Sequence, residues 1–426
     1  MNPQAEELNE NIKSVNKNVY DMLSDKGKAI FFPKKGILAQ TAEAKGKNIN
    51  ATIGIALEED GSPMRLKSIS EKVDLDPKDV FPYAPSFGRP DLREKWKEMM
   101  FKKNPSLKGV EISLPVVTNA LTHGMSMVGY LFMDPGENVI SPDLYWGNYN
   151  LILKSAYGVE FDTFETFKEE GFNVEGLKEK LGLEGDKKIV VLNFPNNPTG
   201  YTPTEDEVTQ IIKVVKEAAE GGKKILMIID DAYFGLVYKD GIYKQSIFSE
   251  LAGLHENVLA VKLDGATKED YVWGLRVGFM TYSVKGGNKE LYSALESKTS
   301  GAIRGNISND SNLSQSLVYN AFSDANYWDE KKEKYELLKK RFMEVESVIN
   351  AHNEYGDEFE ALPFNSGYFM CIKLKNKEGG EVRQILLKRY DTGVIALGNI
   401  LRLAFSATPT NLISELFDNI YKACKE

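Results

Sequence analysis

Three apolar runs of strand length limit the folds that are open to this chain. They span residues 188–194, 224–229 and 257–263, and helical or turn-forming segments separate them. Strands that are apolar almost throughout are buried on both faces, as in a parallel sheet covered by helices. We therefore expect an α/β protein, with a large domain whose mostly parallel sheet is flanked by helices and a smaller α/β domain formed by N- and C-terminal segments.

The charged helical stretch 327–349 separates the segment of apolar strands from a C-terminal segment with shorter strands. Short strands at 368–374 and 401–405 and a last helix at 412–423 follow it. At 426 residues the chain is long enough for more than one core. We predict three segments: an N-terminal arm with part of the small domain at 1–53, the large domain at 54–327, and the small C-terminal domain at 328–426.

The helix that follows the first apolar run carries its own start signal. Thr202 is a candidate N-cap, Pro203 suits the first turn, and Glu205 completes a capping box. A helix between two apolar strands supports the alternating α/β order.

Composition excludes several classes of function. A net charge of −9 argues against general nucleic-acid binding and against anionic membrane surfaces. Two cysteines cannot form a disulfide framework, and three histidines without ligand spacing do not predict a zinc site. No apolar run reaches the length of a membrane span, and the polar N-terminus does not resemble a signal peptide. We expect a protein of the reducing cytosol.

Polar side chains follow each apolar run at the end of the predicted strand. Asn197, Asp230 and Lys268 occupy these places, and Arg276 comes eight residues after the lysine. In an open parallel sheet, ligands bind beyond the carboxyl ends of the strands. Each residue alone has a plain structural explanation, as a turn asparagine, a capping aspartate or a surface lysine. Together they suit a cofactor with an aldehyde and a phosphate.

The same residues resemble a known family. The Asn-Pro-Thr-Gly turn at 197–200, the Asp-x-x-Tyr motif from Asp230 to Tyr233, and the spacing from Lys268 to Arg276 are similar to those of class I aminotransferases of pyridoxal-phosphate fold type I. The aspartate aminotransferase branch is the most similar. The resemblance extends from about residue 49 to residue 421, and the cofactor that it implies is pyridoxal 5′-phosphate.

The resemblance assigns catalytic roles to Lys268, Asp230 and Tyr233. Lys268 would form the Schiff base with the cofactor aldehyde and later move the substrate proton. Asp230 would keep the pyridine nitrogen protonated. Tyr233 and Asn197 would donate hydrogen bonds to the phenolic oxygen of the ring, and Arg276 would bind the phosphate in a bidentate manner.

Further cofactor contacts follow from the resemblance. Backbone N–H groups of Asn119, Ala120 and Leu121 would bind the phosphate at a helix N-terminus, and Trp146 would stack on the ring, although a core tryptophan is the competing interpretation. Three residues depart from the family pattern. Leu121 stands in a loop where the family usually has glycine or a small hydroxyl residue. Gly265 replaces a common serine, and Tyr149 stands where the aspartate branch often has a histidine.

The remaining site residues concern substrate and dimer. Arg402, in an otherwise apolar strand, matches the arginine that binds the α-carboxylate, and Gly54 matches a glycine that lets the backbone approach the substrate. Trp146 and Asn197 would also contact the substrate. Tyr83 and Arg304 resemble residues that reach the active site of a neighbouring subunit, which implies a homodimer with shared sites. A buried structural tyrosine and a solvent-exposed arginine are the alternatives.

The resemblance implies an aminotransferase that moves an amino group between an L-amino acid and a 2-oxo acid such as 2-oxoglutarate. If Arg304 binds a side-chain carboxylate, the donors are aspartate or glutamate, with aromatic amino acids as further candidates. A lyase that performs β-elimination or decarboxylation with the same cofactor is an alternative, because the fold does not choose the reaction. A non-catalytic cofactor-sensing regulator domain is another, although no basic DNA-reading segment is found.

Overall fold

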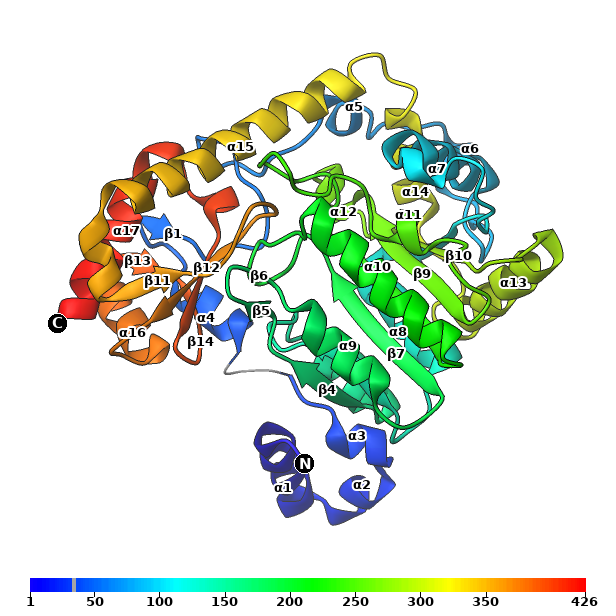
Figure 1. Cartoon of the computed structure of the whole chain (residues 1–426), viewed down its shortest axis with the longest axis horizontal. Helices are drawn as coiled ribbons and strands as arrows, with labels where there is room; N and C mark the ends of the chain where they lie inside the picture. The colour runs from blue at the N-terminus through cyan, green and yellow to red at the C-terminus, as the bar shows by residue number, and fades with distance from the viewer. Residues whose placement is uncertain (33–35) are drawn as a thin grey trace.

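The computed structural model describes residues 1–32 and 36–426, and its centre is a seven-stranded sheet (Figure 1). The strand order is β2-β10-β9-β8-β7-β3-β4. All neighbours from β9 to β4 pair in parallel, and β10 runs antiparallel to both β2 and β9. The strands are β2 (Val116–Asn119), β3 (Asn138–Pro142), β4 (Glu160–Phe164), β7 (Lys187–Asn193), β8 (Lys224–Asp230), β9 (Val258–Gly265) and β10 (Val277–Ser283). The predicted fold class is confirmed.

Two apolar clusters cover the two faces of this sheet. Ile189 and Val191 of β7 pack into the cluster that includes Leu121 of α8 (Ala120–Phe132). Val190 and Leu192 pack into the other cluster, with residues of α10 (Glu205–Glu220). Because side chains alternate across a strand, these runs must be apolar throughout. The other main helices of this part are α7 (Pro90–Lys103), α9 (Val174–Gly182), α13 (Lys289–Asn306) and α14 (Asn312–Ala321).

The start of α10 differs from the prediction by two residues. Thr204 is the N-cap and forms the capping box with Glu207, so the assignment of these roles to Thr202, Pro203 and Glu205 is wrong. The backbone N–H of Thr202 donates to Asn365 Oδ1 at 2.9 Å instead. A contact from a distant part of the chain has overridden the local signal.

A second sheet, with strand order β11-β12-β15-β14, is formed by C-terminal residues. Its strands are β11 (Phe359–Ala361), β12 (Met370–Leu374), β14 (Ile395–Leu397) and β15 (Ile400–Leu403), and its helices are α16 (Gly379–Arg389) and α17 (Ile413–Lys425). The long helix α15 (Tyr327–Ala351) runs from the large sheet to this part of the molecule (Figure 1).

The N-terminal elements α4 (Ile37–Glu43) and β1 (Ile49–Asn50) contact strands of the C-terminal part of the chain. β1 pairs in parallel with β13 (Thr392–Gly393). Before it lie α1 (Pro3–Val15), α2 (Lys17–Met22), α3 (Asp25–Ala29) and α4, in the segment that the sequence predicted to be an N-terminal arm with part of the small domain. The boundaries at 53/54 and 327/328 remain a prediction. Within the described residues, no helix is both long and apolar enough to cross a bilayer.

Candidate active site

A cavity of about 320 Å³ opens where β7, β8 and β9 end. It brings together most of the residues singled out in the sequence, although they come from distant segments. Its lining comprises Ile37, Thr41, Thr52, Gly54, Ala120, Leu121, Thr122, Trp146, Asn193, Asn197, Asp230, Ala232, Tyr233, Thr267, Lys268, Trp273, Arg276, Phe369 and Arg402. The carboxyl ends of parallel strands are where such a site is expected.

Lys268 lies on α12 (Ala266–Glu269), one turn of helix directly after β9. Its Nζ lies 5.1 Å from the centre of the Tyr233 ring. Burial lowers the pKa of Lys268 to about 8; the charge of Asp230 opposes this shift and that of Arg276 adds to it. The amine is therefore neutral for a substantial fraction of the time near neutral pH, as a nucleophile or proton carrier requires.

Asp230 is the last residue of β8 and is buried. Its Oδ2 accepts a hydrogen bond of 2.5 Å from the phenol of Tyr149, and its Oδ1 accepts one of 3.1 Å from the backbone N–H of Ala232. Burial raises the pKa of Asp230, whereas the Tyr149 hydrogen bond and the charge of Lys268 lower it. The carboxylate is thus held in one orientation with donors that favour its anionic form.

Tyr233, Asn197 and Arg402 form a chain of polar contacts across the cavity. Asn197 Nδ2 donates to the Tyr233 phenol at 3.4 Å, and Arg402 Nη1 donates to Asn197 Oδ1 at 3.3 Å. Burial raises the pKa of Tyr233, so the phenol stays protonated and can donate a hydrogen bond. The amide and the phenol therefore belong to the same site, as predicted.

Arg402 comes from β15 of the second sheet and is 3% exposed. Its guanidinium lies 4.2 Å from the centre of the Phe369 ring, Nη2 donates to the Thr52 carbonyl at 3.3 Å, and Nε has no partner among the described residues. No acidic side chain of the described chain pairs with it. A buried cation without an anion is costly, so the site is suited to an anionic ligand.

Arg276 lines the same cavity and also lacks an acidic partner in the described chain. Its Nη1 donates to the Trp273 carbonyl at 3.2 Å, and its backbone has a φ of 56°. Ala120 and Leu121 begin α8, a 13-residue helix, and both line the cavity. A helix N-terminus and a free guanidinium are two of the features that hold a phosphate in proteins.

Three of the predicted residues lie outside this lining. Asn119 precedes α8, and its backbone N–H donates to His123 Nδ1 at 3.1 Å. Tyr83 is 90% exposed. Arg304 lies in the last turn of α13 and donates to Ser308 Oγ at 3.3 Å. The roles of Tyr83 and Arg304 require a second copy of the chain, and they remain predictions.

Sequence reasoning missed part of the lining. Ile37 and Thr41 of α4, Trp273 and Phe369 contribute to the cavity without having been predicted. Trp273 could have been predicted, because it lies in the sequence between the site residues Lys268 and Arg276. Phe369 lies in the predicted strand 368–374 and directly precedes β12, but it carries no functional pattern. Because α4 precedes every motif, only the tertiary structure places these residues here.

The cavity residues fit pyridoxal phosphate. Lys268 supplies an amine for the aldehyde, Asp230 an anion for the pyridine nitrogen, and Tyr233 and Asn197 supply hydrogen-bond donors. Arg276 and the start of α8 supply a phosphate site. In addition, Thr267 Oγ1 and Trp273 Nε1 are buried without hydrogen-bond partners in the described protein. Unpaired donors beside a lysine and an arginine are consistent with a missing polar group.

Comparison with known proteins agrees with this chemistry. The family model described as aminotransferase class I and II, whose members use pyridoxal phosphate, matches residues 49–420. An aspartate aminotransferase from Bacillus sp. (strain YM-2) is 26% identical over 268 residues, which are 61% of this chain and 62% of the relative. An aspartate/prephenate aminotransferase from Thermus thermophilus is 28% identical over 221 residues, 51% of each chain. The chain thus spans between half and two thirds of the length of these relatives.

A solved structure agrees over a longer range. The crystal structure of an aminotransferase from Anaerococcus prevotii superposes with a TM-score of 0.84 and 24% identity, and the match covers 95% of this chain and 100% of the other. At this identity the likeness shows a shared fold.

Proposed function

We propose, from the premise that the chain belongs to the aminotransferase class I and II family, that it transfers an amino group between an L-amino acid and a 2-oxo acid with pyridoxal phosphate as its cofactor. The carrying observation is one cavity that holds Lys268 with a lowered pKa, the buried Asp230, and two arginines without acidic partners, Arg276 and Arg402. We further propose a homodimer in the cytosol.

Each side chain around the cavity has a separate role in this reaction. When bound, the cofactor supplies an electron-withdrawing ring that stabilises negative charge at the substrate α-carbon. Lys268 Nζ removes the proton from that carbon and returns it during the transfer. Asp230 keeps the ring nitrogen protonated, and Tyr149 orients Asp230. Arg402 binds the α-carboxylate, which fixes the substrate for proton transfer.

For the amino donor we propose aspartate or glutamate, and 2-oxoglutarate as the acceptor, with aromatic donors also accepted. The support is indirect. Arg402 accounts for one carboxylate, and Arg304 of a second copy would account for the other, while Trp146 and Phe369 offer apolar contacts to a larger side chain.

Absorbance spectroscopy of the purified protein, reconstituted with the cofactor, tests the reaction. Titration with glutamate, aspartate or phenylalanine should convert the cofactor to its aminated form without an added 2-oxo acid, and 2-oxoglutarate should reverse the change. The variant Lys268→Ala should bind the cofactor but lose turnover by several orders of magnitude. Near-normal turnover in that variant would remove the mechanism.

The lyase alternative has its own assay. β-Elimination releases pyruvate and ammonia from a suitable amino acid without a 2-oxo acid acceptor, whereas amino transfer needs the acceptor for every second half-reaction. Sustained release of pyruvate and ammonia without an acceptor would favour the lyase. A protein that binds the cofactor but converts no amino acid would favour the regulator.

The substrate proposal is tested by Arg304→Ala. Loss of a charge-assisted contact should lower kcat/KM for aspartate and glutamate by roughly 10- to 100-fold, and that for phenylalanine much less. Equal losses for all three donors would remove the role of Arg304 in specificity.

A further inference from the structure

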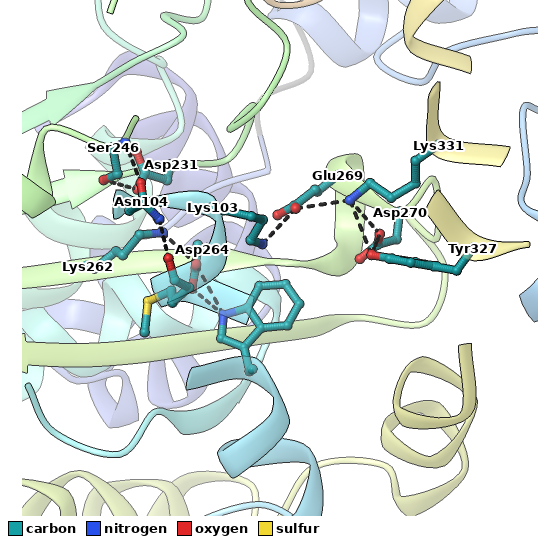
Figure 2. A network of polar contacts seen from close by, with 12 residues as sticks. Lys103, Asn104, Asp231, Ser246, Lys262, Asp264, Glu269, Asp270, Tyr327 and Lys331 are labelled. Atoms are coloured by element: carbon teal, nitrogen blue, oxygen red, sulfur yellow. Dashed lines mark hydrogen bonds and ion pairs between the residues drawn. The ribbon is translucent and has the colours of Figure 1, made fainter. Parts of the chain in front are cut away.

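A network of charged and polar side chains includes the residues that directly follow Asp230 and Lys268 in the chain (Figure 2). In one part of it, Glu269 Oε1 accepts from Lys103 at 2.7 Å and from Lys331 at 3.0 Å. Lys331 Nζ also lies 3.0 Å from Asp270 Oδ1, which accepts a 2.6 Å hydrogen bond from the Tyr327 phenol. Two lysines therefore neutralise two acids that directly follow Lys268 in the chain.

The same arrangement recurs behind the other catalytic strand. Asp231, the residue after Asp230, lies 2.8 Å from Lys262 Nζ and accepts a hydrogen bond from Ser246 (Figure 2). Asp230 and Lys268 line the cavity, and each is followed by a buried acid that pairs with lysine: Asp231 with the buried Lys262, and Glu269 with Lys103 and Lys331, whose side chains are 11% and 15% exposed. Ion pairs of the network thus hold the chain at the residue that directly follows Asp230 and at the residue that directly follows Lys268.

The turn that carries Lys268 has little support of its own. The helix α12 is four residues long, begins without a side-chain cap, and is followed by Tyr271 with a φ of 57°. A left-handed conformation at a tyrosine costs about 1 kcal/mol or more. Contacts with other elements therefore hold this turn in place: those of Glu269 and Asp270, and a hydrogen bond of 3.3 Å from the Tyr368 phenol to the Lys268 carbonyl.

Lys331 and Tyr327 belong to the first turns of α15, and the same helix also holds the substrate end of the cavity. Further along it, Arg341 Nη1 donates to the carbonyls of Leu57 at 2.7 Å and Ser406 at 2.5 Å. Leu57 follows Gly54 by three residues, and Ser406 follows Arg402 by four. One helix thus contacts the chain next to the lysine and the chain next to the carboxylate-binding arginine.

We propose that Lys331 is a positioning residue: it fixes the turn of Lys268 to α15 and thereby sets the amine relative to the substrate held by Arg402. The proposal rests on the proposed function. Buried ion pairs contribute little to stability compared with apolar side chains of similar size, so a role in geometry accounts better for this costly arrangement.

The test compares Lys331→Met with Lys331→Arg, which keeps the charge, and with the matched control Lys239→Met. Lys239 forms an ion pair with Glu346, which lies on α15 farther along the helix than Lys331. This pair is more exposed to solvent than the pairs of Lys331. In Lys331→Met, one acid beside Lys268 loses its counter-ion and the turn loosens. We expect kcat of Lys331→Met to fall about tenfold with a smaller change in KM. In Lys331→Arg, most of the wild-type kcat should be retained. Lys239→Met should behave as wild type.

A spectroscopic readout separates positioning from stability. We expect the pKa read from the absorbance of the bound cofactor to rise by about half a unit in Lys331→Met, because an unpaired acid favours a protonated nitrogen on Lys268. An unchanged spectral pKa and kcat, with only a lower melting temperature, would overturn the proposal. If Lys331→Met does not fold, the same measurement is made on Tyr327→Phe. A smaller rise of the spectral pKa in that variant supports the proposal, and an unchanged spectral pKa refutes it.

The outcome also distinguishes this proposal from the function on which it rests. Wild-type protein that fails to transfer amino groups defeats the proposed function. Wild-type protein that does transfer them, together with an unperturbed Lys331→Met variant, defeats only the role of Lys331.

Discussion

At the scale of single residues, Tyr149 makes a short hydrogen bond with Asp230, the group proposed to hold the cofactor ring. Its phenol is fully buried and donates to Asp230 at 2.5 Å, and burial raises its pKa well above the ordinary value. A histidine in this place titrates near neutral pH, whereas this phenol does not. The support of Asp230 is therefore independent of pH over the physiological range.

Removal of this phenol should weaken cofactor binding. In Tyr149→Phe the Asp230 carboxylate loses a donor worth about 1.5–3 kcal/mol, its pKa rises, and the ring nitrogen is less well held as a cation. We expect the dissociation constant of pyridoxal phosphate to rise about tenfold, measured by equilibrium dialysis. Tyr145→Phe is the control, since Tyr145 stacks on Phe161 and its hydroxyl donates to Asn150 instead. Equal constants in the two variants would contradict the role of Tyr149.

The pKa of Lys268, about 8, sets the pH range in which cofactor-free protein captures an aldehyde. Only the neutral amine reacts, and its fraction falls about tenfold for each pH unit below that pKa. The capture rate of pyridoxal phosphate, followed by stopped-flow absorbance, should rise with pH up to about 8 and then level off. A solvated lysine would show a rise continuing to about pH 10. That continued rise would mean that burial does not tune this amine.

These residue assignments also show what the sequence can predict. Asn197, Asp230 and Lys268 were found because each follows an apolar run, and topology then brings strand ends together. Only the resemblance pointed to the position of Tyr149, and the hydrogen bond of its phenol to Asp230 was not predicted, because the two residues lie 81 positions apart and their contact depends on packing. Lys331 carried no signal at all, since a charged residue in a charged helix is usually a solvated one.

At the scale of elements, the close pairing of β9 and β10 explains why Gly265 departs from the family pattern. Gly265 is the last residue of β9 and has an extended backbone, with φ of 166°. A Cβ at this position would lie 2.5 Å from the Val277 carbonyl oxygen and 2.7 Å from Gly278 Cα. Both atoms belong to the backbone of β10, so there is no flexible side chain to move aside.

Introduction of the serine that is common in the family should therefore destabilise this protein. We expect Gly265→Ser to lower the free energy of unfolding by roughly 1–3 kcal/mol, with a melting temperature lower by several degrees, because the strands must separate. Gly274→Ser, where a Cβ would meet nothing within 4 Å, is the matched control. If Gly265→Ser is as stable as the control and binds pyridoxal phosphate more tightly, the serine hydroxyl is accommodated and the steric explanation is wrong.

The capping of α10 marks another limit of local inference. Two threonines, Thr202 and Thr204, precede the helix with a proline between them, and either sequence pattern permits a cap. The choice falls to Thr204 because Asn365 holds the backbone of Thr202, and Ser366 holds its hydroxyl. Both partners come from more than 160 residues away along the chain. Such a contact is invisible until the second sheet region is placed.

At the scale of the whole molecule, two predicted site residues, Tyr83 and Arg304, do not line the cavity of their own chain. Tyr83 is 90% exposed, Phe81 beside it is 81% exposed, and Arg304 lies outside the cavity. An exposed aromatic pair is consistent with burial against a second copy. Of the two arginines in the cavity, Arg276 is proposed to bind the phosphate, which leaves only Arg402 for the carboxylates of the substrate. In a dimer with twofold symmetry, each protomer would then give and receive the same side chains.

Mixed dimers test this arrangement directly. When Lys268→Ala and Arg304→Ala chains are co-expressed, each homodimer is defective toward aspartate. If sites are shared, a hybrid dimer has one site with both defects and one with neither, since the intact Arg304 of the first chain completes the site of the second. Random association gives hybrids in about half of the dimers, so kcat toward aspartate should recover to about a quarter of wild type.

The two control measurements make the result decisive. Each variant expressed alone should show little turnover of aspartate, and mixing after purification should restore activity only as fast as subunits exchange. If Arg304 instead serves the cavity of its own chain, every hybrid keeps one defect in each site. Activity of the co-expressed sample would then remain at the average of the two separate variants, and sharing of active sites between protomers would be ruled out.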